Sequence, residues 1–391
     1  MYILVISRGY PSKEYPQWGC FEKDQAEALA EYGHKVVVIS VDARFADNRG
    51  KPGLHRFENN GVVYYNYVAV PGVFFYKWMG SYNYRRFISL HCHRLIYERV
   101  CKEIGKPDLL YSHYIHKTFI GALLKKRYNV PLVGIEHLSK FNETVIPSSL
   151  DKEARFAYGN VDSLICVSKT LSLRLKQLYG VDSTVIYNMY GAEFESLEQD
   201  IKSFSDDFVK PFVFVSTASL IKRKGFDALI NAFALANLDK KQWIMNIIGE
   251  GEEKANLEYL IRKFDLQNNV FLLGRMSKIE IVSHLRKSDA FVLTSRNENF
   301  SVAVLEALAT GLPVVATACG GIRECVNENN GIIVAVDDIK AIAAALKRMI
   351  ENYSSYNREL IAEDCKSRFS PHAIASQLTD VFDKVLASRL E

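Results

Sequence analysis

Residues 290–317 read AFVLTSRNENFSVAVLEALATGLPVVAT, and this stretch decides the fold that the sequence predicts. Ala290–Thr294 and Pro313–Thr317 are short apolar runs of the kind that form buried strands, and Ser301–Ala309 has the pattern of a helix between them. A strand, a crossover helix and a second strand make the βαβ unit, whose two strands pair in parallel.

The same alternation runs through the rest of the second half of the chain. The further predicted strands are Phe212–Thr217, Trp243–Ile248, Val270–Leu273 and Ile332–Val336, and the further predicted helices are Phe226–Ala236, Asn256–Phe264 and Ile279–Leu285. Several of these strands are apolar at successive positions, as strands covered on both faces of a parallel sheet are. The pattern predicts a doubly wound α/β domain over residues 208–370.

The first half repeats the plan less regularly. Its predicted strands are Ile3–Ser7, Val36–Ser40, Val62–Val68, Leu109–Tyr111, Leu132–Ile135, Ser163–Val167 and Thr184–Tyr187, with helices at Phe21–Tyr32, Arg86–Ile104 and Leu171–Leu178. A chain of 391 residues is long enough for two domains. We therefore expect a first domain over residues 1–195, a polar linker over Glu193–Lys210, and a C-terminal helix within 371–391 that crosses back to the first domain.

The composition is that of a globular protein, with 48% hydrophobic and 24% charged residues. No apolar run approaches the ~20 residues of a spanning helix, and Met1–Ser7 has the pattern of a strand rather than of a signal peptide. The seven cysteines are scattered without a Cys-x-x-Cys pair. His91 and His93 do not share a helix face, as metal ligands would. We expect a cytoplasmic protein with unpaired thiols and no metal.

Basic charge is concentrated in residues 51–140, which hold 14 Lys and Arg against 5 Asp and Glu. One interpretation is that the aromatic residues of this segment pack on the sheet while its charges are solvated. The other is a surface that docks on anionic lipid at the inner membrane face and receives a lipid-linked acceptor. No nucleic-acid-binding motif accompanies the charge. The aromatic and basic residues at helical spacing there are Tyr84, Arg85, Arg86, Phe87 and His91.

Two carboxylates mark a candidate ligand site within residues 290–317. Glu298 follows the end of a predicted strand, which is the edge where open α/β sheets bind their ligands. Glu306 lies inside a helix that is otherwise almost wholly apolar, where an unpaired carboxylate is costly. The two hydroxyls of a ribose would satisfy Glu306, and so would a buried Arg or Lys or an exit to water.

Cations and glycines follow the other predicted strands of the same domain. Lys222-Arg223-Lys224 precedes Gly225, and the later strands are followed by Gly249-Glu250-Gly251 and by Gly320-Gly321. Lysines neutralise phosphate oxygens, and glycines let a ligand approach the backbone. Each feature alone is also typical of a solvated turn. Together they converge on one crevice at the carboxyl ends of one sheet.

These motifs resemble the donor site of the family 4 glycosyltransferases. Enzymes of that family retain the anomeric configuration and have the GT-B fold, an α/β architecture of two Rossmann-like doubly wound domains facing a central cleft. The resemblance covers essentially the whole chain and is most specific over Ser295–Glu324. Landmarks that match in the first half are Gly33-His34-Lys35-Val36, Ser112-His113, Glu136-His137, Val167-Ser168 and Val185-Ile186-Tyr187-Asn188.

The resemblance implies roles for the matching residues. Glu298 would bind hydroxyls of the donor sugar, Lys224 would contact the diphosphate, and His137 would face the transferred sugar, so these three are the expected catalytic residues. The expected donor-binding residues are Gly19, Ser219, Arg223, Lys224, Gly249, Gly251, Arg275, Glu298, Asn299, Phe300, Ser301 and Glu306. The expected acceptor or membrane side comprises Tyr84, Arg85, Arg86 and His113. No metal and no cofactor is implied, because the nucleotide sugar is a substrate.

Three positions depart from the family pattern. Ser219 stands where the family usually has an arginine, so the second cation for the diphosphate is missing or is supplied by Lys222 or Arg223. Asn299 and Met189 stand where the family usually has glycine. These departures leave the class intact.

The implied function is retaining transfer of a hexosyl-type sugar from a nucleotide sugar, UDP- in preference to GDP-, to a glycan or lipid-linked acceptor. Such a reaction belongs to the synthesis of surface polysaccharides or glycoconjugates. Two alternatives stay open: a nucleotide-sugar 2-epimerase or hydrolase of the same fold, and a non-catalytic nucleotide-sugar sensor. A nicotinamide dehydrogenase is disfavoured, because the first strand leads into Ser7-Arg8-Gly9-Tyr10-Pro11 and not into a Gly-x-Gly-x-x-Gly turn.

Overall fold

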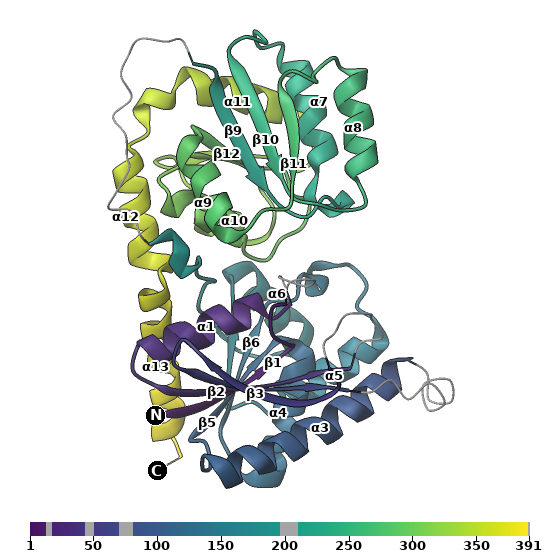
Figure 1. Cartoon of the computed structure of the whole chain (residues 1–391), viewed down its shortest axis with the longest axis vertical. Helices are drawn as coiled ribbons and strands as arrows, with labels where there is room; N and C mark the ends of the chain where they lie inside the picture. The colour runs from purple at the N-terminus through teal and green to yellow at the C-terminus, as the bar shows by residue number, and fades with distance from the viewer. Residues whose placement is uncertain (13–17, 44–50, 70–80, 196–209, 390–391) are drawn as a thin grey trace. The chain divides into compact units, whose positions relative to one another are not determined.

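The computed structural model describes residues 1–12, 18–43, 51–69, 81–195 and 210–389 of the chain (Figure 1). The chain divides into two compact units. Unit 1 comprises Met1–Val167, Ser172–Ile186 and Ile374–Glu391, and unit 2 comprises Ser168–Leu171 and Tyr187–Ala373. The segment predicted as a linker begins inside a short 3-10 turn, η2 (Ala192–Phe194), and its residues 196–209 lie outside the described part.

Unit 1 is built on an eight-stranded sheet. Its strand order is β3-β4-β2-β1-β5-β6-β7-β8, and every neighbouring pair is parallel except β3 with β4. The strands are β1 (Tyr2–Ser7), β2 (Lys35–Asp42), β3 (Gly53–Asn59), β4 (Val62–Val68), β5 (Leu109–His113), β6 (Leu132–Glu136), β7 (Ser163–Cys166) and β8 (Thr184–Val185). The central strands are completely buried, which agrees with their continuous apolar sequence.

Helices cover this sheet between the parallel strands. They are α1 (Cys20–Glu31), α3 (Ser81–Glu103), α4 (Tyr114–Tyr128), α5 (Ser148–Tyr158), α6 (Lys169–Tyr179), whose first turn belongs to unit 2, and α13 (Pro371–Ala387). Figure 1 shows α13 beside the end of α1, where Tyr32 Oη donates to Ser376 Oγ at 3.3 Å. Phe382 of the same helix packs edge-on against Tyr111 of β5, with ring centroids 5.0 Å apart. From Ile374 onward the last helix is therefore part of unit 1.

Unit 2 is built on a six-stranded, wholly parallel sheet with the order β11-β10-β9-β12-β13-β14. Its strands are β9 (Phe212–Thr217), β10 (Trp243–Ile248), β11 (Val270–Gly274), β12 (Ala290–Leu293), β13 (Val314–Thr317) and β14 (Gly331–Val334). Its helices are α7 (Phe226–Ala236), α8 (Lys254–Lys263), α9 (Lys278–Lys287), α10 (Val302–Ala309), α11 (Ile339–Glu351) and α12 (Arg358–Phe369). A stacked pair, Phe233 of α7 and Trp243 of β10, anchors the core with ring centroids 4.4 Å apart.

Both sheets have the topology that places a ligand site. In unit 1 the strand order reverses between β1 and β5, and in unit 2 it reverses between β9 and β12. At such a switch point the loops leave neighbouring strands in opposite directions, which opens a crevice at their carboxyl ends. The residues that follow β9 and β12 are Lys222–Lys224 and Thr294–Ser301, the segments that the sequence singled out for chemistry.

Candidate functional site

The centre of the candidate site is an ion pair at the switch point of unit 2. Lys224 ends η3 (Lys222–Lys224), the turn after β9, and its Nζ donates a short hydrogen bond to Oε1 of Glu298 in the loop after β12. Ser295 Oγ donates to the same oxygen at 2.9 Å. The Glu298 side chain is only 11% exposed and that of Lys224 only 17%. Both charges are largely withdrawn from water, and their pairing offsets part of the cost of that burial.

The two other cations of η3 have different environments. Arg223 Nη1 donates to the carbonyl of Asn297 at 3.0 Å and lies 4.0 Å from Oε2 of Glu298. Lys222 is mostly exposed, and its Nζ pairs with Asp227 at 2.8 Å. Arg223 therefore lies beside the Lys224–Glu298 pair, whereas Lys222 is paired with a carboxylate of α7.

Arg296 was not predicted from the sequence as a site residue. Its side chain joins the loop after β12 to the start of α7 and to the loop after β14. Its guanidinium forms two hydrogen bonds to Asp227, at 2.9 and 3.0 Å, and its Nε donates to Asp337 at 2.8 Å. Burial opposes ionisation of Asp227, but the hydrogen bonds from Arg296 and Lys222 outweigh it and lower its pKa to about 2. The partners are distant along the chain, so no local pattern indicates this role.

The glycines after the strands allow loop backbones to pack closely. Gly225 has φ 69°, and a Cβ there would lie 2.0 Å from the carbonyl oxygen of Thr294. Gly320 has φ 56°, and its Cβ would lie 1.8 Å from the carbonyl oxygen of Glu298. No side chain fits either position. The sequence suggested that these glycines admit a ligand, whereas the structure shows neighbouring loops in the space that side chains would fill.

At Gly249 and Gly251, in the loop after β10, the neighbouring backbone likewise leaves no room for a side chain. Cβ atoms at these positions would lie 1.8 Å from the carbonyl oxygen of Ala218 and 2.2 Å from that of Leu220. Ser219, which lies between Ala218 and Leu220, is half-buried, and its carbonyl accepts a hydrogen bond from the Ile221 N–H at 2.9 Å. The loops after β9 and β10 are thereby packed together beside the switch point.

The start of α10 presents backbone donors at the same edge. Phe300 and Ser301 are buried, and the carbonyl of Phe300 accepts from Asn188 Nδ2 at 3.1 Å. Among the described residues, no protein group accepts a hydrogen bond from the N–H of Phe300 or Ser301. Free N–H groups at a helix start favour an anion.

The remaining predicted donor residues lie at different distances from this centre. Asn299 is buried, and its carbonyl accepts from the Gly321 N–H at 2.8 Å. Glu306 is half-buried on α10. Arg275 is exposed after β11, where it pairs with Glu250 at 3.2 Å. Because β11 is separated from β9 by β10, the strand order does not bring Arg275 to the switch point.

Unit 1 has a second polar cluster at its own switch point, after β1 and β5. Arg8 Nε donates to Oε1 of the fully buried Glu22 at 2.6 Å, and Nη2 donates to Oε2 at 3.2 Å. Burial opposes ionisation of Glu22, but Arg8 outweighs it and lowers the pKa of that carboxyl to about 2. The guanidinium also lies 3.8 Å from the ring centroid of Tyr114. No sequence motif marks this pair, because it forms only when the loop after β1 folds against the buried face of α1.

The two histidines that the sequence singled out lie together in this cluster. The rings of His113 and His137 are parallel, with centroids 5.5 Å apart. His113 is fully buried, burial lowers its pKa to about 4, and neither ring nitrogen has a hydrogen-bond partner among the described residues. It is therefore neutral near pH 7 and does not face solvent, so it cannot contact a membrane surface. Gly19, the one expected donor-binding residue in this unit, has φ 78° and caps α1, where a Cβ would lie 2.1 Å from the Gly9 carbonyl oxygen.

A buried lysine, also missed by the sequence analysis, lies one turn further along α4. Lys117 is 8% exposed, and burial lowers its pKa to about 8 although Glu22 opposes the shift. Tyr114, at the start of the same helix, has φ 62°, a costly conformation for a bulky residue. Buried charge and backbone strain at one switch point are typical of a functional site.

The predicted acceptor and membrane side falls mainly on α3. The side chains of Tyr84 and Arg85 lie outside the described ones. Arg86 is exposed, and its guanidinium carbon lies 4.1 Å from the ring centroid of Phe119. The rings of Phe87 and His91 stack, as residues on one helix face do. No helix of the described part is long and apolar enough to cross a membrane, and no three His, Cys, Asp or Glu side chains there are grouped to hold a metal ion.

Known proteins resemble both halves of the chain. The family described as Glycosyltransferase Family 4 matches residues 23–193, and Glycosyl transferases group 1 matches residues 198–363. The amylovoran biosynthesis glycosyltransferase AmsK of Erwinia amylovora is 30% identical, over 72% of each chain. One component of the human phosphatidylinositol N-acetylglucosaminyltransferase is 26% identical, over 95% of this chain and 74% of that protein. HepE of Anabaena, solved with UDP and glucose, has a TM-score of 0.70 and 20% identity over 98% of this chain and 99% of its own.

Replacing Lys117 by Met should stabilise the protein near pH 7. Below pH 8 the ammonium is present in both the folded and the unfolded chain, and its burial disfavours the fold, on the order of 3 kcal/mol for a pKa lowered from 10.5 to about 8. As the pH rises from 8 to 10.5, the folded chain loses this proton first, so the wild-type protein gains stability and the advantage of the variant shrinks.

Urea unfolding near pH 7 and pH 10 measures this difference, with Lys102→Met on the exposed face of α3 as the control. The control should match the wild-type protein at both pH values. A Lys117→Met variant that is less stable than wild type near pH 7 would show that the ammonium is compensated in the fold.

Proposed function

Since the chain belongs to the family 4 glycosyltransferases, we propose that it transfers a hexosyl unit from a nucleotide sugar, with retention of configuration and without a metal ion. The observation that carries this proposal is the Lys224–Glu298 pair at the switch point of unit 2. When a diphosphate binds, Lys224 can pair with its phosphate oxygens in place of Glu298. The Glu298 carboxylate can then accept hydrogen bonds from hydroxyls of the sugar.

Ser219 stands where the family usually has an arginine, so a second cation for the diphosphate must come from another residue. Arg223 is the residue that we assign to this role. Its guanidinium already lies 4.0 Å from Glu298, so a small movement brings it to a phosphate bound by Lys224. Lys222 is a poorer candidate, because it pairs with Asp227 on the exposed side of the turn. The N–H groups of Phe300 and Ser301 supply further donors at the same edge.

These groups would act mainly as the bond to the leaving nucleotide breaks. Negative charge then grows on the diphosphate, and preorganised cations stabilise the transition state more than the ground state. We propose a front-face displacement through an oxocarbenium-like state, in which a phosphate oxygen serves as the base. His137 is the catalytic residue that we propose for unit 1.

The relatives support the substrates that we propose. HepE was solved with UDP and glucose, which supports a UDP-sugar over a GDP-sugar as donor. AmsK is named for the biosynthesis of amylovoran, and the human relative for glycosylation of phosphatidylinositol. We therefore propose a glycan or lipid-linked acceptor, in the synthesis of a surface polysaccharide or glycoconjugate.

Lys224→Ala should lower turnover by on the order of 10²-fold or more, as loss of a leaving-group stabiliser does in other enzymes. Release of UDP from UDP-sugars, with and without candidate acceptors, measures the effect. Activity of the wild-type protein should survive EDTA. A strict requirement for added Mg²⁺ or Mn²⁺, or equal consumption of donor without an acceptor, would argue against this mechanism.

Arg223→Ala and Lys222→Ala make a matched pair, because each removes one cation from the same turn. Loss of a charged hydrogen bond to the diphosphate weakens binding by ~1.5–3 kcal/mol, so Arg223→Ala should weaken donor affinity about 10- to 150-fold. Lys222→Ala should bind almost as wild type. Calorimetric titration with UDP distinguishes the two, and a larger loss for Lys222→Ala would reverse the assignment.

Glu306→Gln tests the proposed ribose contact on α10. The variant keeps the size of the side chain but loses a charged acceptor, so donor affinity should fall by about 10- to 150-fold while the melting temperature changes little. Glu363→Gln on the exposed face of α12 serves as the control. Unchanged affinity together with a large loss of melting temperature would give Glu306 a purely structural role.

A further inference from the structure

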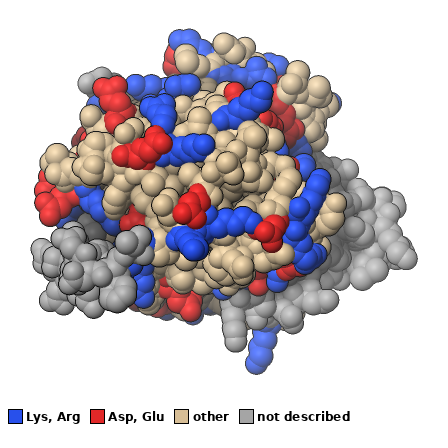
Figure 2. Space-filling model, turned by 90° about the horizontal axis from the view of Figure 1, so that it is seen from above, with Lys and Arg blue, Asp and Glu red and all other residues tan. Residues whose placement is uncertain are grey.

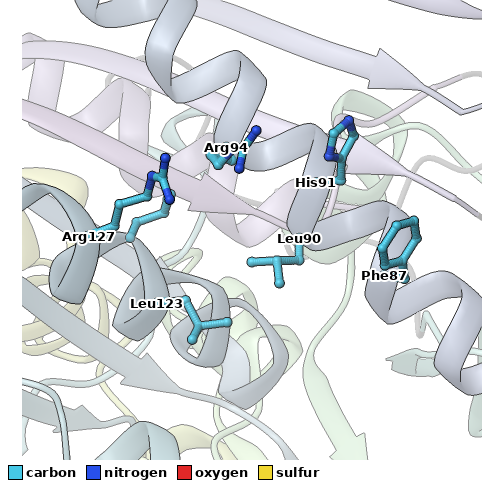
Figure 3. Close-up of a pocket in the computed structure, with 7 residues that line it drawn as sticks. Phe87, Leu90, His91, Arg94, Leu123 and Arg127 are labelled. Atoms are coloured by element: carbon cyan, nitrogen blue, oxygen red, sulfur yellow. The ribbon is translucent and has the colours of Figure 1, made fainter.

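A pocket lies between α3 and α4 of unit 1, away from the switch point. Arg86 of α3 lies over Phe119 of α4, and Tyr97 further along α3 packs on Tyr128 of α4 with ring centroids 4.4 Å apart. The later residue of α3 thus contacts the later residue of α4. The two helices therefore lie side by side and run in the same direction. The pocket, of about 300 Å³, opens between these two contacts (Figure 3).

The pocket is apolar at one end and cationic at the other. Phe87, Leu90 and Leu123 line the apolar end, and the buried Leu124 also lines the pocket. Arg94 follows Leu90 by one helical turn, and Arg127 follows Leu123 in the same way. Because the helices run in the same direction, both guanidinium groups lie toward the same end of the pocket, as Figure 3 shows.

The charges around the cationic end do not cancel. Arg94 lies 3.7 Å from Glu98, which also accepts a hydrogen bond from the Tyr128 hydroxyl. Arg127 donates to the Tyr128 hydroxyl at 3.2 Å and pairs with no carboxylate among the described residues. His91 lines the same pocket. Two arginines against one glutamate leave this end positive, and paired guanidinium groups are well suited to a phosphate.

Exposed apolar side chains lie next to the pocket on α3. Phe87 is 56% exposed and Leu95 is 46% exposed, and both stand among basic residues. The face seen in Figure 2, by contrast, shows basic and acidic side chains interspersed. Exposed apolar groups beside excess positive charge are the pattern of a surface that binds the anionic interface of a bilayer.

We propose that the α3–α4 pocket holds one anionic phospholipid of a bilayer surface, with its phosphate between Arg94 and Arg127 and the start of an acyl chain along Phe87, Leu90 and Leu123. The apolar half of the pocket argues against free phosphate, which has no hydrocarbon to bury there. The site would hold unit 1 at a membrane surface. The inference does not depend on the transfer reaction, because lipid binding is measured without donor or acceptor.

Vesicle sedimentation and calorimetry test the proposal on the full-length protein. The vesicles are phosphatidylcholine with and without phosphatidylglycerol, and the soluble ligands are short-chain phosphatidylglycerol and glycerol phosphate. The protein should sediment only with the anionic vesicles and should bind the short-chain lipid better than glycerol phosphate. The double variant Arg94→Gln with Arg127→Gln should bind the anionic vesicles about 30-fold more weakly, at roughly 1 kcal/mol per basic residue.

Matched variants separate the pocket from charge in general. Arg262→Gln with Arg348→Gln removes two exposed arginines of unit 2 and should leave binding unchanged. Leu123→Trp fills the apolar end without altering charge, and Phe87→Ser removes a mostly exposed ring at little risk to folding. Each should weaken binding of the short-chain lipid.

Three outcomes would overturn the proposal. They are equal binding to both kinds of vesicle, equal losses in the pocket variants and the unit 2 control, and glycerol phosphate bound as well as the short-chain lipid. Capture of the protein by an acidic peptide in competition with the lipid would assign the pocket to a protein partner instead.

Discussion

The rest of the candidate site depends on one ion pair, Lys224 with Glu298. A parallel sheet whose strand order reverses between β9 and β12 brings the ends of two distant segments together, and opposite charges there compensate each other with little exposure to water. Under the proposed function, the pair would rearrange on binding of the donor, with Lys224 turning to the diphosphate and Glu298 to the sugar.

Other features hold the two partners where they are. Arg296 joins the loop after β12 to Asp227 on α7 and to Asp337 after β14, and Gly225 and Gly320 let the loop backbones approach more closely than any side chain allows. These contacts are side-chain ion pairs of Arg296 and close backbone packing at the two glycines, and together they hold the loops in one arrangement. These residues are far apart in the sequence, so the loops come together only when the whole sheet has formed.

Much of this was predictable from the sequence, and the failures have physical causes. The bounds of β9, β10 and α7 agree with the sequence patterns, because buried parallel strands and amphipathic helices have distinct periodicities. Helix α4 was missed because it is buried on several sides and so lacks a polar stripe. Strand β3 was missed because it is an antiparallel edge strand that mixes charged and apolar residues and has no continuous apolar run. The Arg8–Glu22 pair, Lys117 and Arg296 depend on tertiary contacts that no local pattern reports. Glu298 and Lys224 were predicted because each follows a recognisable strand.

The central claim, that a nucleotide diphosphate binds at the carboxyl ends of β9 and β12, is tested most directly by backbone amide NMR during a titration with UDP. We expect the amide resonances of Gly225, Phe300 and Ser301 to move with a common saturation curve. The amides of Gln242 and Asp289, at the opposite ends of β10 and β12, should stay in place. Shifts confined to the opposite ends of the strands, or saturable shifts that leave Gly225, Phe300 and Ser301 unmoved, would contradict the claim.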